Sequence, residues 1–208
     1  MVTFIIPTIG RDTLQDSINS LLNQTIKSWN AIIIFDGIKS NIINYDYDIR
    51  IKIVEIEKIG LNINNSGNVR NYGMSLVGKN TDWIAFLDDD DILSNDYIET
   101  FYNEIYKYED IDVLIFRMIH KDRIIPKIDT DNFYVSDVGI SFIIKKVIYD
   151  KNIKFIPDGA EDFMYLDNIR NNGYKIMISP YVKYFVRNSV GKNVIGNRVF
   201  INIDKRFI

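Results

Sequence analysis

A run of four aspartates, Asp88 to Asp91, directly follows the apolar segment 83–87. The segment is short and holds aromatic and β-branched residues, which predicts a buried strand. Four adjacent carboxylates repel one another and cannot all lie in a core, so we expect them where the strand reaches the surface. Clustered carboxylate oxygens suit a hard divalent cation such as Mg²⁺ or Mn²⁺. The alternative is a solvated acidic turn that leads into a helix near Ser94.

The composition indicates a globular protein and excludes several classes of function. The chain has 208 residues, of which 47% are hydrophobic, so a sizeable core is expected. A net charge of -3 argues against a nucleic-acid-binding protein. The absence of cysteine excludes disulfides, thiolate nucleophiles and cysteine-ligated zinc. No apolar stretch approaches the ~20 residues of a membrane span, and Pro7 interrupts the apolar N-terminal residues. We therefore expect a soluble, cytoplasmic protein without a signal peptide; peripheral association with a membrane stays open.

The first half of the chain alternates predicted strands and helices, which favours a parallel sheet with crossover connections. Its expected strands are 2–6, 29–35, 49–56 and 83–87, and its expected helices are 14–22 and 69–77. The second half is more mixed. It has expected helices at 97–108 and 161–172, and expected strands at 112–119, 138–144, 174–178 and 181–186. The expected fold class is therefore α/β, with a mixed, mainly parallel central sheet flanked by helices.

Short motifs occur in a characteristic order along the chain. They are FIIPT at 4–8, FDG at 35–37, GNVRNYG at 67–73, FLDDDD at 86–91, AEDFM at 160–164 and YFVR at 184–187. Together they resemble the family-two glycosyltransferases of the GT-A fold, over roughly residues 2 to 187. Two departures are the lack of a second Asp before Gly37 and of a His after the Glu161-Asp162 pair. The third metal ligand is therefore open.

The resemblance implies a metal-dependent, inverting glycosyltransferase that uses Mn²⁺ or Mg²⁺. It would move a sugar from a nucleotide-sugar donor, with UDP as the first choice of nucleotide, to a hydroxyl acceptor in glycan biosynthesis. A single GT-A domain would then span 1–208, with a nucleotide-binding half at about 1–91, an acceptor half at about 92–187 and a tail at 188–208. One alternative is a nucleotidyltransferase that makes the sugar nucleotide, although residues 7–11 hold only one of the glycines that its loop needs. The other is a non-catalytic nucleotide-sugar-binding module.

The resemblance also assigns roles to the aspartate run. Asp90 is expected to be the main metal ligand, and Asp88 faces the metal or the nucleotide ribose, so 88–90 form an Asp-x-Asp motif. Asp89 is expected on the donor side and Asp91 on the acceptor side, and each has a purely structural alternative. A divalent cation held here would neutralise the charge that develops on a diphosphate leaving group.

Further donor contacts are expected from the loops that follow the first two strands and from the helix after 66. Asp36 is expected to accept a hydrogen bond from the nucleobase, or else to shape the Asp-Gly turn. Pro7 and Thr8 would place backbone groups against the base. Arg11 either pairs with a phosphate or is a solvated residue. Arg70 is expected near the nucleotide-sugar; the alternative is a salt bridge to the aspartates, and the two do not exclude each other.

Inversion at the anomeric carbon requires a base that takes the proton of the acceptor hydroxyl. The resemblance implies that Asp162 is this catalytic base and that Glu161 is its neighbour on the acceptor side. The alternative is a helix start enriched in acids, which the helix dipole favours.

Overall fold

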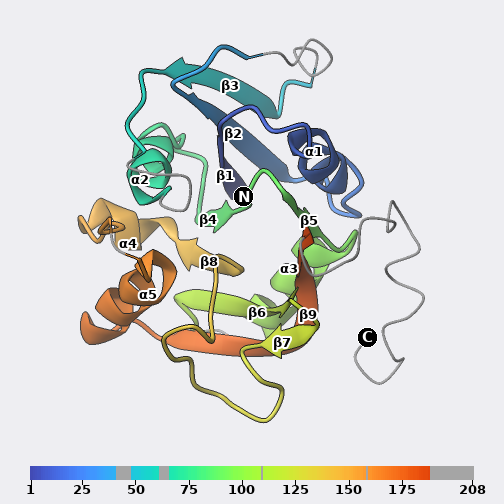
Figure 1. The fold of residues 1–208 in the computed structure, drawn as a ribbon. Helices are drawn as coiled ribbons and strands as arrows, with labels where there is room; N and C mark the ends of the chain where they lie inside the picture. The colour runs from blue at the N-terminus through green and yellow to red at the C-terminus, as the bar shows by residue number, and fades with distance from the viewer. Residues whose placement is uncertain (41–47, 61–65, 109, 158, 188–208) are drawn as a thin grey trace.

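The computed structural model describes residues 1–40, 48–60, 66–108, 110–157 and 159–187, which form one sheet with flanking helices (Figure 1). The strands are β1 (Val2–Thr8), β2 (Trp29–Asp36), β3 (Ile51–Ile56), β4 (Trp83–Phe86), β5 (Asp91–Leu93), β6 (Val113–His120), β7 (Arg123–Ile125), β8 (Phe142–Lys145) and β9 (Ile176–Val186). The helices are α1 (Leu14–Leu22), α2 (Gly67–Ser75), α3 (Tyr97–Lys107), α4 (Lys146–Asp150) and α5 (Glu161–Asn171). The predicted α/β class is confirmed.

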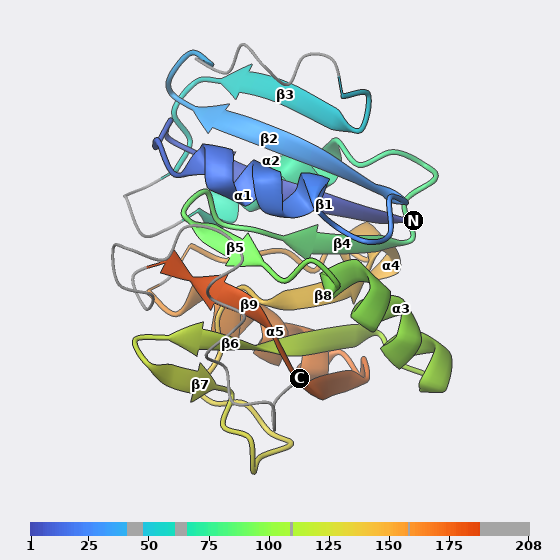
Figure 2. The same cartoon turned by 90° about the vertical axis from the view of Figure 1, so that its right-hand side faces the viewer.

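The sheet is mixed, and its parallel part comes from the first half of the chain. The strand order is β3-β2-β1-β4-β8-β6-β9-β5, with β7 paired to β6 (Figure 2). β3, β2, β1 and β4 run parallel, as the alternation of strands and helices predicts. β8 pairs antiparallel with both β4 and β6, so one continuous sheet joins the two halves.

Helices cover both faces of this sheet. α1 and α3 lie on one face, and α2, α4 and α5 lie on the other (Figures 1 and 2). β1 is buried along its whole length, and β2 is buried at every position except Asn30. This double coverage explains why both strands are nearly continuous apolar runs.

The first strand continues through Pro7, where we expected it to end. The carbonyl of Ile5 accepts a hydrogen bond from the backbone N–H of Leu87 just beyond β4, which shows that odd-numbered positions of β1 face β4. Pro7 faces the same side, but β4 already ends at Phe86, so no ladder hydrogen bond is lost by the missing N–H. On the other side β1 still pairs with β2 as far as Thr8 and Phe35.

The second half differs from the sequence prediction in three strands. The two predicted late strands are one long strand, β9, whose pairing with β6 shifts register around Arg117. β8 is shorter than predicted, because residues 138–141 belong to a loop. A short strand that we did not expect, β5, begins at the last residue of the aspartate run and pairs antiparallel with β9. The predicted tail at 188–208 lies outside the described residues.

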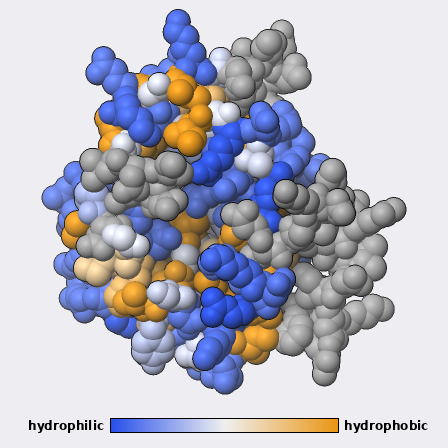
Figure 3. All heavy atoms as spheres, viewed as in Figure 1, coloured by the Kyte–Doolittle hydropathy of each residue, from blue (hydrophilic) through white to orange (hydrophobic). Residues whose placement is uncertain are grey.

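Hydrophilic side chains predominate on the face shown in Figure 3, with hydrophobic patches between them. Within the described part of the chain, no helix is long and apolar enough to span a membrane.

Gly73 is the last residue of the motif at 67–73, and the close packing of α2 on the sheet explains why this residue is a glycine. It lies on α2 where the helix crosses the sheet. A Cβ atom at this position would come within 2.5 Å of Ile5 Cγ2 and 2.7 Å of Ile34 Cδ1. Both neighbours are fully buried and cannot move aside freely. The glycine therefore lets α2 approach the sheet closely enough to present Arg70 to the site described below.

We predict that Gly73→Ala destabilises the protein by about 1–2 kcal/mol in urea unfolding. Overpacking costs up to about 3 kcal/mol, while the better helix propensity of alanine returns about 1 kcal/mol. Gly78→Ala is the control, because a Cβ atom there meets nothing within 4 Å. Equal unfolding midpoints for parent and Gly73→Ala would show that α2 can shift without cost.

Candidate active site

A cleft of about 370 Å³ lies at the carboxyl ends of the parallel strands. This is where ligands bind in open α/β sheets. Both halves of the chain contribute to its walls. The lining residues are Pro7, Thr8, Ile9, Arg11, Asp36, Lys58, Ser66, Val69, Arg70, Asp88, Asp89, Asp90, Ser136, Val138, Gly159, Ala160, Glu161, Asp162 and Phe163. All but one of the residues predicted to form the site thus lie together, the exception being Asp91.

Asp89 fastens the loop after β1 to the loop after β4. Its Oδ2 accepts a hydrogen bond from Thr8 Oγ1 at 2.7 Å, and its Oδ1 accepts one from Arg11 Nη1 at 2.8 Å. Burial raises the pKa of Asp89, and these two donors oppose that rise. Its buried contacts give Asp89 a positioning role in the cleft wall.

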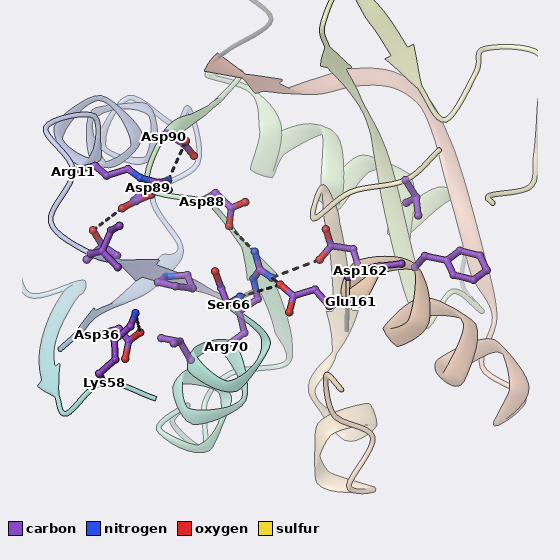
Figure 4. A pocket seen from close by; sticks show the side chains of 18 of the residues that line it. Arg11, Asp36, Lys58, Ser66, Arg70, Asp88, Asp89, Asp90, Glu161 and Asp162 are labelled. Atoms are coloured by element: carbon purple, nitrogen blue, oxygen red, sulfur yellow. Dashed lines mark hydrogen bonds and ion pairs between the residues drawn. The ribbon is translucent and has the colours of Figure 1, made fainter. Parts of the chain in front are cut away.

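Arg11 bridges two aspartates, a contact that the sequence did not predict. Its Nη1 lies 2.8 Å from Asp89 Oδ1 and 3.0 Å from Asp90 Oδ2 (Figure 4). The pKa of Asp90 is raised by burial and by repulsion from Asp88, and Arg11 partly offsets both effects. Arg11 therefore holds a cationic charge at the point where the aspartates converge.

Asp91 does not line the cleft, contrary to the expectation of an acceptor-side role. It lies in β5 and is buried. The Tyr184 hydroxyl donates a hydrogen bond to its carboxylate, and the backbone N–H of Arg187 donates another at 3.2 Å. The same tyrosine oxygen accepts a hydrogen bond from the Asp88 N–H at 3.2 Å. Asp91 and Tyr184 thus fix the turn that carries the cleft aspartates. Asp91 is the first residue of β5, and the pairing of β5 with β9 places it in the interior beside Tyr184.

Arg70 is the buried centre of the cleft. Only 4% of its side chain is exposed. Nη2 lies 2.6 Å from Asp88 Oδ1, and Nη1 lies 2.5 Å from Glu161 Oε1 and 3.6 Å from Asp162 Oδ1. The three carboxylates raise the pKa of Arg70 although its burial opposes this, so it stays charged. The salt-bridge alternative raised for Arg70 is therefore the observed contact (Figure 4).

Glu161 links the two halves of the chain. Its Oε1 accepts a hydrogen bond from the Ser66 N–H at 3.1 Å, and its Oε2 accepts one from the Gly67 N–H at 2.9 Å. These amides belong to the N-terminal end of α2, where unpaired N–H groups favour a carboxylate. Only 8% of the side chain is exposed. Glu161 therefore docks the start of α5 on the start of α2.

Asp162 faces the cleft, and the pKa of its carboxyl group lies close to neutral pH. Burial raises its pKa to about 7; Arg70 lowers the pKa, whereas Asp88 and Glu161 raise it. About a quarter of the side chain, 26%, is exposed. Within the described residues its buried Oδ1 accepts no hydrogen bond. A carboxylate with a pKa near 7 is suited to accept a proton from a bound hydroxyl group.

Asp36 and Lys58 form the far end of the cleft. The Asp36 carboxylate accepts hydrogen bonds from Lys58 Nζ at 2.5 Å, from the Ile59 N–H at 2.7 Å and from the Gly60 N–H at 3.1 Å. Asp36 thereby fixes the segment after β3. Lys58 was not predicted, although it follows a strand whose carboxyl end faces the same edge of the sheet, and that rule would have found it.

Ser136, Val138 and Phe163 were also missed. They come from a loop and from the residue after Asp162, and no motif marked the loop. Their place in the cleft depends on the pairing of β8 between β4 and β6, which the sequence did not reveal.

The carboxylates of Asp88 and Asp90 suit a divalent cation that binds together with phosphate groups. Among the described residues, no three carboxylate or imidazole groups converge as a ready-made metal site. Asp88 and Asp90 each use one oxygen in an ion pair, with Arg70 and with Arg11, and the second oxygen of each lies outside these ion pairs. Mg²⁺ and its relatives commonly take only one or two carboxylates and complete their shell with phosphate oxygens and water. The two aspartates therefore fit such an ion.

Residues 3–176 match the family Glycosyl transferase family 2. The chain belongs to this family.

Two curated relatives agree with the family match. The chain is 30% identical over 235 residues to the poly(ribitol-phosphate) beta-N-acetylglucosaminyltransferase TarP of Staphylococcus aureus (strain N315). The aligned region covers 98% of this chain and 70% of TarP. The chain is also 30% identical over 114 residues to the glycosyltransferase GlyA of Streptococcus pneumoniae serotype 4 (strain ATCC BAA-334 / TIGR4). This aligned region covers 52% of the present chain and 15% of GlyA.

Solved structures agree with the fold. A crystal structure of S. aureus TarS 1-349 superposes with a TM-score of 0.73 at 17% identity, and covers 89% of this chain. A structure of TarS 1-349 in complex with UDP-GlcNAc superposes with a TM-score of 0.71, also at 17% identity, over 88% of this chain. The present chain spans 60% and 57% of these two TarS chains.

The chain is therefore a nucleotide-sugar-dependent glycosyltransferase. It has the GT-A fold that the motifs suggested. The nucleotidyltransferase alternative is set aside by this family match.

We predict that Arg70→Met lowers the free energy of unfolding by about 3–5 kcal/mol, because it leaves the buried Glu161 carboxylate without its cation. Chemical denaturation measures the change. Lys175→Met is the control: its ion pair with Asp110 is largely exposed and should contribute little to stability. A loss from Arg70→Met no larger than that of the control would contradict a central role for the Arg70 ion pairs.

Proposed function

We propose that this glycosyltransferase moves N-acetylglucosamine from UDP-GlcNAc to a hydroxyl group of a polyol-phosphate chain, with inversion at the anomeric carbon. The observation that carries the proposal is Asp162, an accessible carboxyl group with a pKa of about 7 in the cleft. The choice of donor and acceptor follows from the name of TarP and from the TarS complex with UDP-GlcNAc.

The donor would lie along the cleft with its base near Asp36 and its diphosphate near the aspartate loop. A carboxylate has about four acceptor positions, and Asp36 uses three of them for Lys58, Ile59 and Gly60. One position remains for the N–H of uracil. Pro7 and Thr8 line the wall beside Asp36.

Asp90 and Asp88 would hold Mn²⁺ or Mg²⁺ with one oxygen each. When bound, such an ion supplies Lewis-acid stabilisation of the diphosphate leaving group. Arg11 adds a fixed positive charge beside Asp90, and this charge can pair with a phosphate oxygen.

Asp162 would take the proton from the acceptor hydroxyl as its oxygen attacks the anomeric carbon. The new carbon–oxygen bond forms as the bond to the diphosphate breaks, and the proton ends on the Asp162 carboxylate. A single displacement of this kind inverts the configuration. Arg70 keeps Asp162 in place through its charge, since their atoms lie 3.6 Å apart.

We predict that Asp162→Asn lowers transfer by about 10²–10⁴-fold, the range typical of lost general-base catalysis. The amide keeps the size of the side chain but cannot accept the proton. UDP binding, measured by calorimetry, should be nearly unchanged and serves as the control. Near-normal transfer would move the base to another residue, and retained anomeric configuration in the product, read by NMR, would reject single displacement.

The pH dependence of transfer should report the same group. The base is active when ionised, and its pKa is raised from the usual range to about 7. The rate of the parent should therefore rise as the pH increases through about 7 and then level off. Asp162→Asn should lack this rise. A parent profile that is already flat from pH 5 to 8 would show that no group with this pKa limits transfer.

We predict that Asp90→Ala abolishes the Mn²⁺-dependent part of UDP binding while leaving the fold intact, because Asp90 lies at the solvent-facing edge of the cleft. Calorimetric titration with UDP, with and without Mn²⁺, measures this. Asp110→Ala, which removes a carboxylate outside the cleft, is the control. If Asp90→Ala keeps the metal dependence of the parent, Asp90 is not a ligand.

An assay of the parent protein without acceptor distinguishes an enzyme from a non-catalytic binding module. The parent should release UDP slowly from UDP-GlcNAc in the absence of acceptor, whereas a binding module would release none.

A further inference from the structure

Ser136 lies in the cleft wall with a backbone conformation that serine rarely adopts. Its φ angle is +66°, in the left-handed region. The backbone N–H of Asp137 donates a hydrogen bond to the Tyr134 carbonyl at 3.0 Å, so Ser136 is the third residue of a tight turn. A turn with positive φ at this position ordinarily holds glycine or asparagine.

The other non-glycine residues with positive φ in the described part of the chain have local explanations. Lys121 and Asp122 form the two-residue loop of the β6–β7 hairpin, where both loop positions require positive φ. Asn152 follows the C-terminal end of α4, a usual place for asparagine in this conformation. Ser136 alone among these residues lines the cleft.

The segment that carries Ser136 is fastened strongly enough to hold a strained residue. Arg117 is buried, and its guanidinium donates hydrogen bonds to a series of backbone carbonyls of that segment. They are those of Pro126 at 2.8 Å, Lys127, Ile128 at 3.3 Å and Thr130 at 3.1 Å. This arrangement fixes the path of 126–130 before the turn.

The other end of the segment is anchored to the helix that begins beside the proposed base. The Phe133 ring packs edge-on against the Phe163 ring with centroids 6.0 Å apart, and Phe163 directly follows Asp162. The Arg170 guanidinium lies 4.7 Å from the centre of the Phe133 ring and also contacts Asn132. The segment 126–138 therefore belongs to the α5 side of the cleft.

We propose that Ser136 is a specificity-determining residue whose hydroxyl forms a hydrogen bond with a hydroxyl of the polyol acceptor. Ser136 is exposed, it lines the cleft, and its segment is tied to the helix that carries Asp162. Strain kept at a binding surface is typical of residues that position a ligand. A glycine would fit the turn better but would lack the hydroxyl. This inference rests on the proposed function, because it assigns part of the same cleft to the acceptor.

The test compares Ser136→Gly and Ser136→Ala with the parent, using UDP-GlcNAc as donor and poly(ribitol-phosphate) as acceptor probe. Both variants should lower kcat/KM for the acceptor by roughly 3- to 10-fold, the effect of one lost hydrogen bond, mainly through a higher acceptor KM. The donor KM and the slow release of UDP into water should stay within about twofold of the parent. Ser136→Gly should also melt at a temperature equal to or up to ~3 °C above the parent, because the turn is relieved of strain.

Asn152→Gly is the matched control. It also places glycine at a position of positive φ, but outside the cleft, so transfer by this variant should match that of the parent. Unchanged acceptor kinetics in both Ser136 variants would overturn the inference, and so would an equal loss of UDP release into water, which would assign Ser136 to the donor. Release of UDP by the parent without any transfer to the probe would also overturn it. No UDP release by the parent from UDP-GlcNAc would instead refute the proposed function itself.

Discussion

The cleft depends on one buried cation. Arg70 stands on α2, yet its guanidinium contacts Asp88 after β4 and Glu161 on α5, which are far apart in the sequence. Glu161 in turn accepts hydrogen bonds from the Ser66 and Gly67 amides at the start of α2. Because an unpaired charge in the interior is costly, each of these groups requires the others. The two halves of the chain are thereby held in one arrangement around the cleft.

Positive side chains balance most of the carboxylates that converge on the cleft. Arg11 pairs with Asp89 and Asp90, Arg70 with Asp88 and Glu161, and Lys58 with Asp36. These pairs allow a crowded acidic surface to fold before any ligand binds. They also leave the groups with unequal surroundings. Asp162 Oδ1 lies 3.6 Å from Arg70 Nη1, and burial raises the pKa of Asp162 to about 7. That inequality is what would distinguish Asp162, as the proposed proton acceptor, from the structural acids around it.

The wall opposite the aspartate loop is built by different means. Backbone carbonyls bound by Arg117 and the contact of Phe133 with Phe163 shape the segment 126–138. Such contacts are specific to one loop path and place few demands on residue type elsewhere. The side proposed to bind the nucleotide, by contrast, uses strand ends and a helix start, whose geometry is regular. On the proposed assignment of segment 126–138 to the acceptor, acceptor preference can change with this segment while the proposed nucleotide side stays the same.

The sequence alone determined the parallel half of the sheet, because apolar runs such as 29–35 and the helices between them have clear periods. It also placed Asp88, Asp90 and Asp162 correctly in one cleft, since strand ends and a helix start carry recognisable motifs. Tertiary structure decided the rest. Asp91 turned out to be buried because β5 pairs with β9. Arg70 and Glu161 became structural ion partners because α2 and α5 meet. Lys58 follows the end of β3, so the strand-end rule could have found it. Ser136 joined the cleft through strand pairings and loop contacts between residues distant in sequence, and local patterns contain no information about such contacts.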